Sequence, residues 1–122
     1  MSHGPYVRYI HAFVHGCRIG VLVEVGTETD YLTKSPEFEA WVHDIAIHIA
    51  GKGPADLGEL MGQQFVKDET KSIRDLVREA RTRFREHIEI MRFVRWDNEI
   101  PLRTDIPTPP KAPAVIMRFD KK

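Results

Sequence analysis

Residues 15–25 read His-Gly-Cys-Arg-Ile-Gly-Val-Leu-Val-Glu-Val, a run in which branched aliphatic residues recur at every second position from Ile19 onward. This period of two is typical of a β-strand that buries one face. The preceding residues 6–14 are rich in aromatic and β-branched side chains, which also favour strands. Gly16 lies between the two runs and allows a tight turn. The pattern predicts an antiparallel hairpin with strands at 6–14 and 18–25.

Two amphipathic helices are predicted after the hairpin. The first begins at Pro36 with Ser35 as its N-cap, and it stops at the glycine- and proline-containing segment 51–54. The second begins after Ser72, which forms a capping-box pattern with Asp75. Apolar residues recur at helical spacing in both segments. That spacing predicts these core residues: Phe38, Trp41, Ile45, Leu76, Val77 and Phe84.

The remaining segments complete a small fold. Residues 26–35 are polar and predict a loop. Residues 55–62 predict a short connector with about one helical turn, and residues 64–67 predict an extended piece. Residues 87–96 predict a third strand. One side of that strand is expected to carry Ile88, Ile90, Val94 and Trp96. The order β-β-α-α-β predicts an α+β fold, a small three-stranded antiparallel sheet with helices packed on one face.

The composition limits the classes of function. The 122 residues suffice for one domain, with 42% hydrophobic and 30% charged residues. Five prolines fall in residues 101–122, so we expect a domain at 1–100 and a proline-rich tail at 101–122. Lysine plus arginine equals aspartate plus glutamate at 18 each, which argues against a broad electrostatic grip on nucleic acid.

The cysteine content and the length of the apolar runs give evidence on the cellular compartment. Cys17 is the only cysteine, which excludes an internal disulfide and favours a reducing compartment. The first residues show no signal-peptide pattern, and no apolar run is long enough to span a bilayer. We therefore expect no membrane association.

No pattern of catalytic or metal-binding residues is evident. The segment 51–54 lacks the spacing of a phosphate-binding loop. His43 and His48 are five residues apart, which on a helix separates them by roughly 140° and disfavours a shared metal ion. Cys17 has histidines nearby in the sequence but no orienting third group, so a structural thiol is the simpler interpretation. We expect no enzyme activity, no metal and no cofactor.

Several motifs, in order along the chain, resemble the core or dimerisation domain of elongation factor Ts. Residues 15–25 are similar to the family's hairpin, and Glu-Thr-Asp-Tyr at 28–31 is similar to its Glu-Thr-Asp-Phe loop. Residues 44–50, Asp-Ile-Ala-Ile-His-Ile-Ala, resemble its first core helix. Residues 63–68, Gln-Gln-Phe-Val-Lys-Asp, and 92–96, Arg-Phe-Val-Arg-Trp, match two further motifs. The resemblance spans residues 9–97.

The chain also departs from the family's pattern. The resemblance implies a short form that lacks the N-terminal ubiquitin-associated-type module. It also implies loss of the coiled-coil insertion, because the corresponding region is only residues 55–62. Tyr31 replaces the usual phenylalanine, and the proline-rich tail matches nothing familiar in the family.

The resemblance implies a translation factor that promotes guanine nucleotide exchange. In the family, the aromatic residue of the loop wedges into elongation factor Tu and GDP leaves. Carried over by motif, Asp30 and Tyr31 would form the tip, and Thr29 would shape the loop. His48 would be either a partner contact or a helix-packing residue. Val66 and Lys67 would be either partner contacts or a plain sheet edge.

The expected partner is elongation factor Tu in its GDP-bound and nucleotide-free forms, in the bacterial cytoplasm or an organellar matrix. Self-association is also expected, because some short members of the family form homodimers through the sheet. The alternative is a non-exchanging structural or interaction protein that reuses the core fold within a larger assembly, with residues 101–122 binding a neighbour. RNA binding through Arg8, Arg18, Arg92 and Arg95 is disfavoured by the balanced charge.

Overall fold

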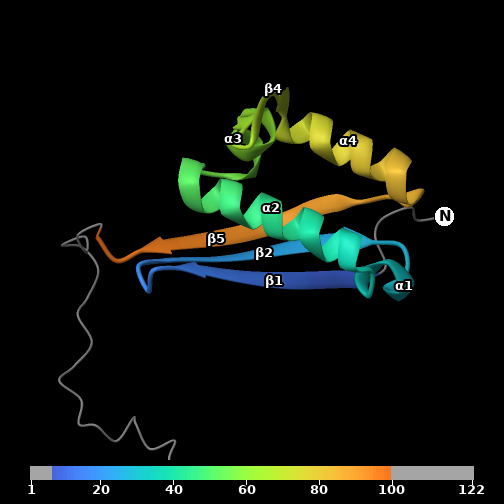
Figure 1. The fold of residues 1–122 in the computed structure, drawn as a ribbon, viewed down its shortest axis with the longest axis horizontal. Coiled ribbons are helices and arrows are strands. Elements are labelled where there is room, and N and C mark those ends of the chain that lie inside the picture. Colours follow the sequence, from blue (N-terminus) through green and yellow to red (C-terminus); the bar gives the residue numbers. More distant parts are fainter. Residues whose placement is uncertain (1–6, 100–122) are drawn as a thin grey trace, which may run out of the picture.

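The computed structural model describes residues 7–99 and contains one three-stranded antiparallel sheet with β2 in the middle. Helices α2 and α4 lie across one face of that sheet (Figure 1). The elements in chain order are β1 (Val7–His15), β2 (Ile19–Thr27), α1 (Asp30–Thr33), α2 (Pro36–Lys52), α3 (Leu57–Gly62), β3 (Gln64–Phe65), β4 (Asp68–Ser72), α4 (Ile73–Phe84) and β5 (Glu89–Asp97). The predicted α+β fold is confirmed. The expected tail at 101–122 lies outside the described residues.

The predicted hairpin is formed by β1 and β2. The two strands pair from Val7 opposite Thr27 to His15 opposite Ile19. Gly16 and Cys17 join them with φ angles of 61° and 56°, and Arg18 N–H donates to the His15 carbonyl at 3.0 Å. Two consecutive residues with positive φ match the right-handed twist of the flanking strands, which is why glycine is favoured there.

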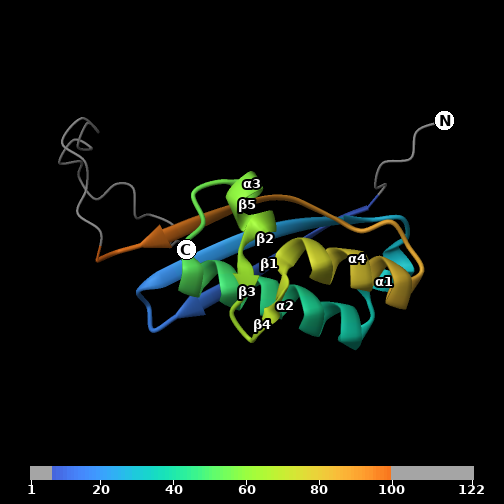
Figure 2. The same cartoon turned by 90° about the horizontal axis from the view of Figure 1, so that it is seen from above.

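Both long helices begin where their N-capping residues predict, and α2 also ends in the predicted segment. The Ser35 hydroxyl accepts a hydrogen bond from Phe38 N–H at the start of α2, and Gly53 ends the helix in the left-handed conformation. Seen from above, α2 and α4 run side by side over the strands (Figure 2). The apolar face of α2 packs on β1 and β2. The alternation predicted for β2 is confirmed by the burial of its valines at 21, 23 and 25.

The core lies between this helical layer and the covered face of the sheet. Of the predicted core residues, Phe38, Ile45 and Val77 are buried. The other three, Trp41, Leu76 and Phe84, pack against the core while keeping part of their surface in solvent. Fully burying a side chain such as Phe38 contributes roughly 1.5–3 kcal/mol of stability.

A β-bulge overturns part of the prediction for the third strand. Val25 pairs with Ile90, but the adjacent Glu24 pairs with Arg92, so Met91 is an extra residue on β5. An extra residue reverses the side-chain alternation beyond it. Ile88 and Ile90 are buried as expected, whereas Val94 and Trp96 are exposed on the opposite face of the sheet. Their predicted placement on one side with Ile88 and Ile90 was wrong.

Two short elements also differ from the predictions. The predicted loop at 26–35 contains the end of β2 and the one-turn helix α1, because Thr29 caps a turn that begins at Asp30. The predicted extended piece at 64–67 is confirmed only for β3, and it pairs with β4, which the sequence did not indicate. β4 consists of polar and charged residues without an apolar alternation.

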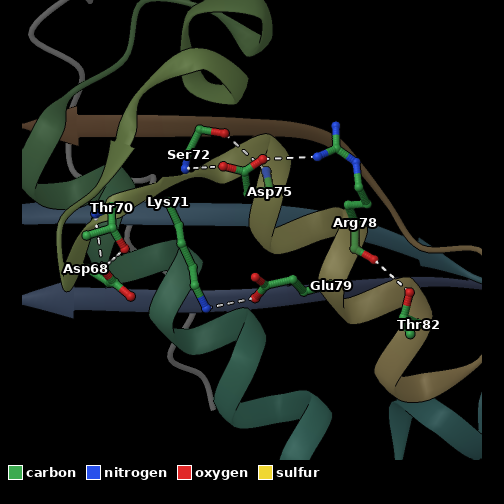
Figure 3. A network of polar contacts seen from close by, with 8 residues as sticks. All are labelled: Asp68, Thr70, Lys71, Ser72, Asp75, Arg78, Glu79 and Thr82. Carbon is green, nitrogen blue, oxygen red and sulfur yellow. Dashed lines mark hydrogen bonds and ion pairs between the residues drawn. The ribbon is translucent and has the colours of Figure 1, made fainter.

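The start of α4 is fixed by a network of polar side chains (Figure 3). The predicted capping box is present, with Ser72 N–H donating to Asp75 Oδ2 at 3.0 Å and Asp75 N–H donating to Ser72 Oγ at 3.1 Å. The backbone N–H of Ser72 is the main reason that the pKa of Asp75 is lowered. An ion pair between Lys71 and Glu79 and another between Arg78 and Asp75 surround the box.

Candidate partner-binding surface

The predicted tip residues lie together at the start of α1. The Thr29 hydroxyl accepts a hydrogen bond from Leu32 N–H, which closes the single turn. Leu32 points inward and is buried, and α1 contacts both β2 and α2. This orientation turns the ring of Tyr31 outward, and its side chain is 82% exposed. Asp30 is also exposed, so the structure presents both tip residues to solvent.

The backbone before the tip is fixed from inside the fold. Thr27 is fully buried, and its hydroxyl donates to the carbonyl of Thr29 at 2.9 Å. On the other side of the tip, the hydroxyl of Thr33 donates to the carbonyl of Asp30 at 2.8 Å. Side-chain hydrogen bonds of this local kind define the path of a short loop. Tyr31 is therefore an exposed aromatic ring on an ordered base.

His48 is placed differently from the tip residues, because its side chain is fully buried. The backbone N–H of Val66 donates to His48 Nδ1 at 3.1 Å, so this nitrogen carries no proton. Nε2 then carries the proton and donates to the side-chain oxygen of Gln63 at 2.9 Å. Burial is the main cause that lowers the pKa of His48. These contacts correspond to the helix-packing alternative, and a role of His48 in partner binding stays a prediction.

Val66 and Lys67 form the turn between β3 and β4, which we call the β3–β4 hairpin. Val66 is 40% exposed, and Lys67 Nζ lies 2.7 Å from Asp44 Oδ1 on α2. The buried His48 holds this hairpin by accepting a hydrogen bond from Val66 N–H. The structure brings the predicted residues His48, Val66 and Lys67 together in one region.

The two groups of predicted residues are separated along α2. The tip lies just before the helix begins, whereas β3 and β4 lie beside the body of α2 (Figure 2). There the β3–β4 hairpin bonds to Asp44 and His48. At a rise of about 1.5 Å per residue, the helix spans roughly 12–18 Å between its start and these two residues. A partner that touches both groups must therefore extend along α2.

The four arginines considered for RNA binding do not form an unpaired basic cluster. Arg8 and Arg92 both pair with the buried Glu24, at 3.9 and 2.8 Å. Arg18 pairs with Asp97 and Glu99. Arg95 donates two hydrogen bonds to the Ala50 carbonyl at the end of α2. Each of these arginines has an ion-pair or hydrogen-bonding partner within the fold, which gives no support to an RNA-binding surface.

One histidine contact was not anticipated from the sequence. His11 Nε2 lies 2.9 Å from His43 Nδ1, which joins β1 to α2. Burial, followed by the neighbouring His43, lowers the pKa of His11. Spacing along the chain could not indicate this pair, because its members are 32 residues apart. In residues 7–99 there is no cluster of three or more side chains suited to hold a metal ion.

Comparisons with known proteins identify the family. No protein-family model matches the chain. Elongation factor Ts of Coprothermobacter proteolyticus is 31% identical over 133 residues, which cover 71% of this chain and 68% of that protein. The chain belongs to the elongation factor Ts family. Elongation factor Ts of Geobacter metallireducens is 32% identical over 140 residues, covering 78% of this chain and 63% of the relative.

The chain matches only part of its elongation factor Ts relatives. It covers about a quarter of the protein from Trichlorobacter lovleyi, with 41% identity over 77 residues. The 133-residue alignment with the Coprothermobacter protein is longer than this whole 122-residue chain. That relative therefore carries additional residues inside the aligned region, which agrees with a shortened form. Among residues 7–99, no helix is both long and apolar enough to cross a membrane.

Proposed function

We propose that the chain binds elongation factor Tu and promotes GDP release through the loop formed by Thr29, Asp30 and Tyr31. The observation that carries the proposal is the 82% exposure of Tyr31 on an ordered turn. Exposing an aromatic ring to water has no benefit for the fold itself. In a member of the elongation factor Ts family, at the position of the family's wedging aromatic residue, this exposure suits insertion into a partner.

The proposed mechanism is thermodynamic linkage. A factor that binds the nucleotide-free state of its partner more tightly than the nucleotide-bound state weakens nucleotide binding by the same ratio. Shifting such an equilibrium from almost fully closed to almost fully open requires about 5.5 kcal/mol of differential affinity. A buried aromatic ring supplies part of this, and the Tyr31 hydroxyl needs a hydrogen-bonding group in the partner's pocket.

The β3–β4 hairpin is proposed as a second contact. Val66 and Lys67 are both exposed, and His48 supports them from within the core. We assign His48 an indirect role, because a fully buried side chain reaches a partner only through the residues that it holds. A contact along α2 from Tyr31 to Lys67 would give the bound partner a defined orientation.

Nucleotide release from elongation factor Tu loaded with a fluorescent GDP analogue tests the proposal. The protein should accelerate release, Tyr31→Ala should lose most of the acceleration, and Tyr31→Phe should separate the ring from the hydroxyl. Lys34→Ala, at the other end of α1, is the control for truncation near the tip. Absence of binding and of release with elongation factor Tu from the same organism would favour the alternative, an interaction protein that reuses the core fold.

We further propose that the chain forms a homodimer through the face of the sheet that carries no helix, here called the open face. Five of the seven large hydrophobic side chains exposed in residues 7–99 lie on it. They are Ile10 (57% exposed), Val14 (65%), Leu22 (48%), Val94 (47%) and Trp96 (78%). Contiguous apolar patches of this kind mark interaction sites.

The shape of the open face suits a second copy of itself. Gly20 lies between Val14 and Trp96 in the register, and Ala12 lies beside Leu22. A two-fold contact brings the open faces of two copies together, which allows large side chains of one copy to pack over small residues of the other. Strands of nine residues make a face of roughly 30 by 14 Å, which is small for a stable dimer.

Sedimentation velocity over a range of concentrations tests the homodimer. We expect reversible association that Leu22→Glu abolishes and that Val66→Glu, an equally apolar position outside the open face, leaves intact. A chain that stays monomeric at all concentrations would show that another partner covers this face.

A further inference from the structure

The loop that carries Tyr31 is bonded to the connection between α4 and β5 by two glutamates that cross each other. Glu86 Oε1 accepts hydrogen bonds from Glu28 N–H at 3.0 Å and from Thr29 N–H at 3.1 Å. Glu86 Oε2 accepts from the Thr29 hydroxyl. In return, Glu28 Oε2 accepts from His87 N–H at 2.8 Å. We call these four residues, Glu28, Thr29, Glu86 and His87, the clasp.

The position of Glu86 is set by how α4 ends. Arg85 caps the helix in the left-handed conformation with φ of 60°, and its N–H donates to the Arg81 carbonyl. This conformation is unfavourable for a residue with a side chain, so surrounding contacts must maintain it. On the other side of Glu86, Arg81 Nε donates to the carbonyl of the buried Ile88 at 2.9 Å. Glu86 is therefore held from both sides.

From this arrangement we infer that Glu86 is a positioning residue for the Asp30-Tyr31 tip, an inference that rests on the proposed function. The Thr29 hydroxyl links the two parts: it donates to Glu86 and accepts the N–H of Leu32 in the first turn of α1. Fixing Thr29 therefore fixes the turn that presents Tyr31. Ordering a loop before the encounter removes an entropic cost from binding.

The clasp requires a carboxylate at position 86. Three donors converge on it, two backbone N–H groups on one oxygen and a hydroxyl on the other. A carboxylate offers acceptors on both oxygens, whereas a glutamine amide offers acceptors on only one. Glu86→Gln thus keeps the size of the side chain and removes the acceptor of the Thr29 hydroxyl. The matched control is Glu89→Gln, an exposed carboxylate three residues on whose hydrogen-bonding partner is the ring of His87.

The first measurement concerns the free protein. Glu86→Ala removes the acceptor of both backbone N–H groups, so amide hydrogen exchange at Glu28 and Thr29 should become faster in this variant. It should stay unchanged in the matched variant Glu89→Ala. Global unfolding by urea is measured alongside, because a general loss of stability would accelerate exchange throughout the chain. Unchanged exchange at Glu28 and Thr29 in Glu86→Ala would overturn the inference without any reference to a partner.

The second measurement is the affinity for nucleotide-free elongation factor Tu, taken as a double-mutant cycle. Glu86→Gln should weaken binding by about 5- to 30-fold, the factor that corresponds to the entropy of fixing one residue. The same substitution in the Tyr31→Ala background should cause little further loss. An equal loss in both backgrounds would show that Glu86 acts apart from Tyr31 and would overturn the inference. If the wild-type protein does not bind, the proposed function fails and the inference falls with it.

Discussion

The tip loop and the β3–β4 hairpin are both held by a side chain that accepts backbone N–H groups, but the two acceptors differ in kind. Glu86 holds the tip loop with a carboxylate near the surface, whereas His48 holds the hairpin with a buried imidazole. A carboxylate has only acceptors at neutral pH, but imidazole Nδ1 accepts only while it carries no proton. The hydrogen bond that holds the hairpin is therefore sensitive to pH through a buried group, whereas the tip loop is held by an acceptor near the surface.

The largest expected effect comes from removing the buried anchor. His48→Ala leaves Val66 N–H and Gln63 without their partner and opens a cavity, so we expect a loss of about 2–4 kcal/mol in the free energy of unfolding. Urea denaturation measures the loss. Tyr31→Ala should change stability by no more than about 0.5 kcal/mol, because its ring is exposed. Equal losses in the two variants would remove the distinction between the regions.

A smaller effect is expected from acidification. The pKa of His48 in the folded protein lies below its ordinary value of 6.5, mainly because of burial. As the pH falls, the unfolded chain takes up the proton first, so the stability that the neutral imidazole supplies is full above pH 6.5 and decreases below it. The pKa of His11 is shifted in the same direction and adds to the slope.

Urea denaturation at pH 7.5, 6.5 and 5.5 measures this dependence. For each such histidine the slope approaches at most about 1.4 kcal/mol per pH unit. His48→Gln should reduce the slope, because glutamine does not titrate. A slope that is the same in both proteins would mean that the hairpin is not the pH-sensitive region.

The smallest effect on stability is expected at Lys67. Its ion pair with Asp44 is exposed, with 51% and 37% of the two side chains accessible, and such pairs contribute about 0.2–1 kcal/mol. Lys71→Ala removes a comparable exposed pair with Glu79 and is the control. Both variants should unfold alike in urea, but only Lys67→Ala should slow association with elongation factor Tu. Identical association rates would restrict the proposed contact to the tip.

Much of the fold could be predicted because its signals are local. The β1–β2 hairpin, α2 and α4 were recognised from alternation, helical spacing and capping residues within each segment. The outward placement of Val94 and Trp96 could not be recognised in this way. It follows from the extra residue Met91, and a bulge is a property of two paired strands rather than of one sequence segment.

The same distinction between local signals and contacts distant in the sequence applies to the candidate site. Thr29, Asp30 and Tyr31 were indicated by resemblance to a family motif, and the structure places the three at one exposed turn. The role of Glu86 could not be indicated, because its partners are 57 and 58 residues away and nothing in the local sequence marks it. The burial of His48 was likewise open, since a histidine in an amphipathic helix is compatible with either face.

The central strand acquires its two neighbours at very different times. β1 adjoins β2 across the three residues 16–18, but Glu24 and its partner Arg92 are 68 residues apart. Hairpins form in about 1–10 μs, whereas synthesis of 68 residues takes roughly 3–14 s at about 5–20 residues per second. During each round of synthesis the edge of β2 that pairs with β5 is therefore free for seconds. A nascent chain that stalls before β5 presents an aliphatic strand with a free edge, which is a template for aggregation.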